Sequence, residues 1–112
     1  EHTSRGLGDV YKRQALTSSG PAIIALIIEA LSDGGLSGGL PKILSEELIM
    51  EMILGTISLI KENQLTPSEL KNLVTSPGGT TISALRVLEK KSVRSALIES
   101  IVSASNRSKE FN

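Results

Sequence analysis

The spacing of apolar residues predicts helices along almost the whole chain and no strand. Residues 22–31 are apolar on nearly every face. Pro21 suits a first helical turn, and Gly34 and Gly35 are expected to end this helix. About 20 apolar residues are needed to span a bilayer, so this segment is too short to do so. We therefore expect a helix that is buried in protein.

The longest predicted helix covers residues 41–62 and is apolar on two faces. One face carries Ile43, Met50, Ile53, Leu54, Ile57 and Ile60, and the other carries Leu44, Leu48, Met52 and Leu59. A helix with two apolar faces needs two partners, and about 100 residues provide too few elements to cover both. The pattern therefore predicts that a second copy of the chain covers the rest, with Ile53 and Ile57 at or near a helix–helix contact.

Three shorter helical patterns follow. Residues 66–69, Thr-Pro-Ser-Glu, predict a helix start in which the threonine and the glutamate cap each other's backbone N–H groups, and this helix runs to about residue 74. The next helix is expected over about residues 80–90. Ser92 is then expected to cap the last helix, whose residues 106–112 should fray.

Residues 75–81 form a loop rich in hydroxyl groups, with the sequence Thr-Ser-Pro-Gly-Gly-Thr-Thr. Pro77 ends the preceding helix, and the glycine pair allows a ligand to approach the backbone closely. The first N–H groups of the following helix lack intrahelical partners, and they suit a carboxylate or a phosphate. The spacing alone favours an interhelical turn with a threonine cap. The candidate binding residues are Ser76, Gly78, Gly79, Thr80 and Thr81.

The residues around this loop favour a binding site over a simple interhelical turn. Residues 70–89 resemble the C-terminal signature of pyrroline-5-carboxylate reductase, at Leu70, Leu73, Thr75, Ser76, Gly78, Gly79, Thr81, Ala84, Leu85, Leu88 and Glu89. Residues 15–22 resemble the segment that opens the helical domain of that family, and residues 35–41 resemble its next interhelical turn. The resemblance covers residues 15–112 without an evident gap.

This resemblance implies an all-α, interlocking helical dimerisation domain of the 6-phosphogluconate-dehydrogenase C-terminal-like type. It also implies a homodimer, sometimes assembled further into a decamer. The implied reaction is reduction of Δ1-pyrroline-5-carboxylate to L-proline with NADPH or NADH, the final step of proline biosynthesis. By the same resemblance, Ser76, Gly78, Gly79 and Thr80 bind the substrate with Thr81, and the Thr81 hydroxyl is the catalytic candidate that hydrogen-bonds the ring nitrogen.

The resemblance has limits. The family has an N-terminal Rossmann domain, but no strand precedes a G-x-G-x-x-G turn here, so we expect this chain alone to bind no cofactor and to be inactive. Ile23 replaces a frequent tyrosine, and residues 90–93 replace a Gly-Gly-Phe-like turn. These departures leave two alternatives open: a free-standing, non-catalytic helical interaction module, or a diverged relative that acts on a different cyclic imine.

Residues 1–14 resemble neither part of such an enzyme. They look like translated adaptor sequence, so the domain boundaries are predicted as residues 1–14 for a non-native leader and residues 15–112 for the helical domain. We expect this leader to pack against nothing. A natural basic arm on a free-standing domain is the competing interpretation.

Composition excludes several classes of function. Lysine plus arginine total 12 and aspartate plus glutamate total 12, so no basic surface suits nucleic acid. Cysteine is absent, which fits a reducing cytoplasm, and the one histidine, His2, lies in the leader. We therefore predict no bound metal, no nucleic-acid or membrane partner, and a cytoplasmic location.

Overall fold

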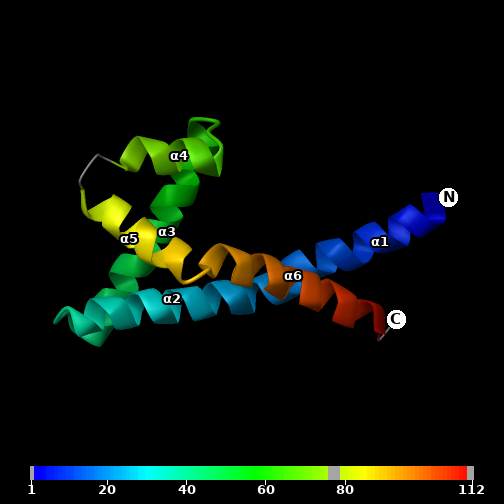
Figure 1. Cartoon of the computed structure of the whole chain (residues 1–112), viewed down its shortest axis with the longest axis horizontal. Coiled ribbons are helices and arrows are strands. Elements are labelled where there is room, and N and C mark those ends of the chain that lie inside the picture. The colour runs from blue at the N-terminus through cyan, green and yellow to red at the C-terminus, as the bar shows by residue number, and fades with distance from the viewer. Residues whose placement is uncertain (1, 76–78, 111–112) are drawn as a thin grey trace. The chain divides into compact units, whose positions relative to one another are not determined.

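The computed structural model describes residues 2–75 and 79–110, and every regular element in these ranges is a helix (Figure 1). The prediction of an all-α fold is confirmed. The chain divides into two compact units, residues 1–25 with 88–112, and residues 26–87. The elements are α1 (His2–Gln14), the π-helical turn η1 (Ala15–Ser19), α2 (Gly20–Ser37), α3 (Lys42–Glu62), α4 (Pro67–Val74), α5 (Thr80–Lys90) and α6 (Val93–Glu110).

The first unit is built on the contact of α6 with α1 and η1 (Figure 1). The helix runs from α1 through η1 into α2 without a break, because Gln14 and Gly20 both keep helical backbone angles. Among the residues of this unit whose burial is described, Ala15 in η1 and Ser105 in α6 are buried. The Ser108 hydroxyl donates a hydrogen bond to Oε1 of Gln14 at 3.2 Å.

The expectation that residues 1–14 pack against nothing is wrong. No helix stop lies between residues 14 and 20, so α1 is continuous with η1, and α1 contacts α6. The expected fraying is also wrong for residues 106–110, which remain helical. Whether residues 1–14 originate from an adaptor stays a prediction.

The continuous helix changes the membrane argument. The stretch Gly8–Ser37 has the length and apolar composition of a membrane span, and 11% of its most apolar window is buried. The prediction that this helix is too short to span a bilayer considered residues 22–31 alone. The observed helix is longer, so its length does not exclude a span. A core helix of a water-soluble protein can have the same length and composition.

In the second unit, α2 ends at a Schellman turn. The N–H of Gly39 donates to the carbonyl of Leu36 at 3.0 Å, and the N–H of Leu40 donates to that of Gly35 at 3.0 Å. Gly39 has a φ of +102°, which an L-residue rarely adopts. The expectation that Gly34 and Gly35 end this helix is therefore wrong, because the second glycine pair supplies the stop and the first lies inside α2.

Gly35 has a different role, because it lets α3 approach α2. A Cβ added at Gly35 would clash with Oγ of Ser45. Ser45 is 1% exposed, and its hydroxyl donates to the carbonyl of Ser32 in α2 at 2.8 Å. The close contact at Gly35 and the hydrogen bond of Ser45 therefore fix the position of α3 against α2.

We expect Gly35→Ala to lower the free energy of unfolding by about 1 to 3 kcal/mol, the usual effect of overpacking a closed contact. Urea unfolding would measure the change. Gly34→Ala is the matched control, because a Cβ there meets nothing within 4 Å and alanine favours helix more than glycine does. Equal stability of the two variants would show that the contact with Ser45 is not tight.

The remaining helix ends largely match the predicted positions. The predicted capping box of α4 is confirmed: the Glu69 N–H donates to Oγ1 of Thr66 at 3.1 Å, and the Thr66 N–H donates to Oε1 of Glu69 at 2.8 Å. Helix α3 contacts α4. Ser92 lies at the predicted position between α5 and α6, but with a φ of +60° it acts through its backbone, whose carbonyl accepts from the Ala96 N–H.

The capping box predicts a pH dependence. The hydrogen bond from the Thr66 backbone, followed by that from its side chain, lowers the pKa of Glu69. A carboxylate with a lowered pKa in the folded state stabilises that state above its ordinary pKa, and this contribution is lost as pH falls through the lowered value. In urea unfolding, Glu69→Ala should therefore be destabilising at pH 7, and the difference from wild type should shrink at low pH. The control Ser68→Ala, which removes no carboxylate, should lack this trend.

Candidate functional site

The predicted anion-binding loop lies between α4 and α5, within the second unit. Helix α4 ends at Val74, and Thr75 has extended backbone angles, with φ −100° and ψ 99°. Ser76, Pro77 and Gly78 lie outside the described residues, so the predicted roles of Ser76 and Gly78 stay predictions. The described part of the loop resumes at Gly79, directly before α5.

Three of the predicted binding residues, Gly79, Thr80 and Thr81, are brought together at the start of α5. Helix α5 begins at Thr80, so the N–H groups of its first turn have no partner within the helix. Thr80 is exposed, whereas Gly79 and Thr81 are half-buried. The start of α5 thus presents backbone donors and two hydroxyl groups at the positive end of the helix dipole.

The residues of this loop contribute dipoles and no charge. No residue from Thr75 to Thr81 carries a charge. An anion here would be held by N–H and O–H donors, which orient a small carboxylate without adding a titratable group. Among the described residues, no three His, Asp or Glu side chains are placed to hold a metal ion.

Thr75 has a structural role that sequence reasoning did not give it. Its hydroxyl donates to the carbonyl of Lys71 at 2.6 Å, and its N–H donates to the carbonyl of Asn72 at 3.3 Å. Both bonds satisfy carbonyls that the end of α4 leaves open. The sequence does contain a signal for this role, because a threonine four positions after a residue near a helix end can donate to the backbone carbonyl of that residue. Thr75 and the capping box therefore fix the two ends of the helix that leads into the loop.

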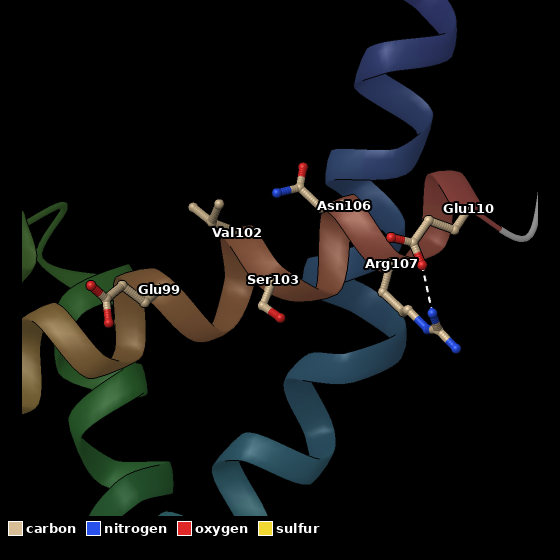
Figure 2. Close-up of a pocket in the computed structure, with 6 residues that line it drawn as sticks. All are labelled: Glu99, Val102, Ser103, Asn106, Arg107 and Glu110. Carbon is tan, nitrogen blue, oxygen red and sulfur yellow. Dashed lines mark hydrogen bonds and ion pairs between the residues drawn. The ribbon is translucent and has the colours of Figure 1, made fainter.

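A shallow hollow along α6 involves none of the predicted binding residues. Figure 2 shows its lining, which comes from this one helix and includes the ion pair between Arg107 and Glu110. A surface formed by one helix offers no opposing wall to enclose a small molecule. The start of α5 therefore remains the better candidate for a binding site.

Comparison with known proteins decides the family. The sequence profile described as pyrroline-5-carboxylate reductase dimerisation matches residues 11–111. The chain belongs to this family. The match starts four residues before the boundary that we predicted at Ala15.

Relatives of the reductase family agree in sequence and in fold. Pyrroline-5-carboxylate reductase from Synechocystis is 50% identical over 96 residues, which cover 86% of this chain and 36% of the relative. The crystal structure of the Plasmodium falciparum reductase with NADP bound superposes with a TM-score of 0.89 at 33% identity, over 92% of this chain and 39% of that one. The Coxiella burnetii reductase gives a TM-score of 0.87 at 40% identity, over 92% and 38%.

The chain spans little more than a third of the length of these relatives. The resemblance of residues 70–89 and 15–22 to the reductase family is thus confirmed as a family relationship. The roles of the individual binding residues stay predictions.

Proposed function

We propose that this chain is the dimerisation and substrate-binding part of a pyrroline-5-carboxylate reductase, which reduces Δ1-pyrroline-5-carboxylate to L-proline with NADPH or NADH. The match of residues 11–111 to the dimerisation family carries this proposal. The proposed reductase is cytoplasmic, as the absence of cysteine suggested. Two further observations support the proposal: the surface of the isolated chain and the loop before α5.

The exposed apolar residues support a dimer. Within the second unit, Leu26, Ile43 and Leu54 keep 63%, 73% and 69% of their surface exposed. Contiguous exposed apolar surface of this kind marks an interaction site. Among the described residues, Ala15 is the one apolar residue that is fully buried, so most of the apolar core is missing from a single copy.

A second copy covers this surface better than a membrane does. Glu29 and Asp33 lie on α2, within the stretch that is long enough to span a bilayer, and both are exposed. If this stretch were centred in a bilayer, Glu29 would lie within the hydrocarbon, where a carboxylate is unfavourable by up to about 2.5 to 3.5 kcal/mol. At a protein interface, the same side chains can reach water at the rim. Dimerisation therefore accounts for the exposed apolar residues of α2 and α3 together.

The loop before α5 supports the substrate assignment. The substrate carries a carboxylate and an imine nitrogen that is readily protonated, so binding and orientation are the main tasks of the protein. The N–H groups of Gly79, Thr80 and Thr81, with the Ser76 hydroxyl, would hold the carboxylate. The Thr81 hydroxyl would then hydrogen-bond the ring nitrogen and fix the face of the ring that accepts hydride.

The hydride must come from outside the described residues. A reduced nicotinamide supplies it when bound, but such cofactors bind at the carboxyl ends of parallel strands, and the described part of the chain contains no strand. These residues do not fit the cofactor. In this proposal the chain positions the imine, and a cofactor domain positions the nicotinamide.

A fusion tests the proposal. The N-terminal part of the Synechocystis reductase, joined in frame before Ala15, should turn over pyrroline-5-carboxylate with NADPH or NADH, whereas the chain as given should not. Cofactor oxidation in the presence of substrate measures both. A folded, dimeric fusion that binds NADPH but reduces no pyrroline-5-carboxylate would contradict the proposed substrate site.

A further inference from the structure

One apolar face of α3 is left uncovered along its whole length. Leu44, Leu48, Met52 and Leu59, which we call the α3 stripe, lie on one side of the helix and keep between 42% and 48% of their surface exposed. On this face of the helix, one position between Met52 and Leu59 has no apolar side chain. Gly55 occupies it, three residues after Met52 and four before Leu59.

Nothing within the described chain requires glycine at residue 55. A Cβ built there meets no atom within 4 Å, and its backbone φ is not in the left-handed region. Gly35 and Gly39 differ, since one avoids a clash and the other has a positive φ. A glycine inside a helix costs about 0.5 to 1 kcal/mol relative to alanine. In a single copy, Gly55 therefore weakens α3 without any compensating contact.

A close helix contact would supply the compensation. The distance between two packed helices is set by the side chains at their crossing, and a glycine there lets the two backbones approach. From the uncovered stripe and the open space at Gly55, we propose that the α3 stripe packs against a helix of a second copy and that Gly55 is the point of closest approach. This inference rests on the proposed dimer and adds the position of its tightest contact.

A second copy is the occupant that the surface favours. The sequence match over residues 11–111 is to a dimerisation family, and a second copy would present the same apolar faces. Glu51 lies beside the stripe and is exposed, so a bilayer covering the stripe would bring this carboxylate into the hydrocarbon. At a dimer interface the same carboxylate can remain at the solvated rim.

The variant Gly55→Ala tests the proposal, because the proposal determines whether the variant associates more weakly than wild type or equally well. In an isolated helix, alanine is the better helix former, so an exposed Gly55 predicts a variant that is more helical and associates as before. At a close crossing, the added methyl group separates the helices. We expect the dimer Kd of the full chain to rise at least 10-fold for Gly55→Ala and still more for Gly55→Leu. Gly34→Ala, the same change on α2 and outside the α3 stripe, should leave the Kd unchanged.

Sedimentation equilibrium and circular dichroism on the same samples separate the outcomes. If the wild-type chain is a monomer, the proposed dimer itself is wrong. If wild type is a dimer and Gly55→Ala associates equally or more tightly, the dimer stands and the placement of Gly55 is wrong. If Gly55→Ala loses helix content in the monomer, its effect lies in the fold and the proposal is also wrong. Weaker association with undiminished monomer helicity supports it.

Discussion

In the fused enzyme, Thr81→Ala is expected to lower kcat/KM for pyrroline-5-carboxylate by about 10- to 100-fold. This is the effect of removing one hydrogen bond of about 1.5 to 3 kcal/mol to a charged group. Nicotinamide affinity should stay nearly the same, because Thr81 lies at the start of α5 and not in a cofactor domain. Steady-state kinetics with varied substrate and varied NADPH measure the two effects separately.

Two companion variants sharpen this result. Ser76→Ala should mainly raise KM, because its hydroxyl is expected to bind the carboxylate equally in the ground and transition states. Ser83→Ala is the control, since Ser83 is an exposed hydroxyl residue of the same helix outside the loop. If Thr81→Ala and Ser76→Ala both matched wild type, residues 76–81 would be only a turn and a helix cap.

The second large effect is expected on the other apolar face of α3, opposite the α3 stripe, where Ile53 and Ile57 are predicted to contact a helix. Ile57 is 47% exposed in the single chain, so a charge there should change the stability of an isolated copy by less than about 0.5 kcal/mol. If a second copy covers it, Ile57→Glu buries an unpaired carboxylate, and the dimer Kd should rise at least 100-fold. Size-exclusion chromatography over a dilution series would detect the shift.

Ser68→Glu is the matched control for this change. It introduces the same charge in the first turn of α4, where a carboxylate is favourable to the helix. It should leave association unchanged. An Ile57→Glu variant that dimerises like this control would place the subunit contact away from that face of α3.

Much of the fold could be predicted because its signals are local. The helix starts at residues 66 and 80 depend on a few neighbouring residues, and the capping box appears as predicted. The predictions were wrong where contacts between residues far apart in the sequence determine the structure. The continuation of the helix through residues 14–20 accompanies its contact with α6, and the glycine pair inside α2 makes sense only beside Ser45.

The candidate site could be predicted only in part, for a physical reason. The free N–H groups at the start of α5 follow from the helix boundary, which sequence signals locate well. The role of Thr75 depends on a carbonyl one turn earlier, and the roles of Thr81 and Ser76 depend on a bound substrate. The Gly55 contact would need a second chain, whose position no local pattern encodes.

Sedimentation equilibrium of the chain at micromolar concentration tests the central claim most directly. We expect a homodimer, because large apolar side chains of α2 and α3 are exposed in the single copy, with Ile43 at 73% and Leu54 at 69%. A stable, helical monomer with a cooperative unfolding transition would contradict it, since the exposed apolar faces of α2 and α3 would then need no partner.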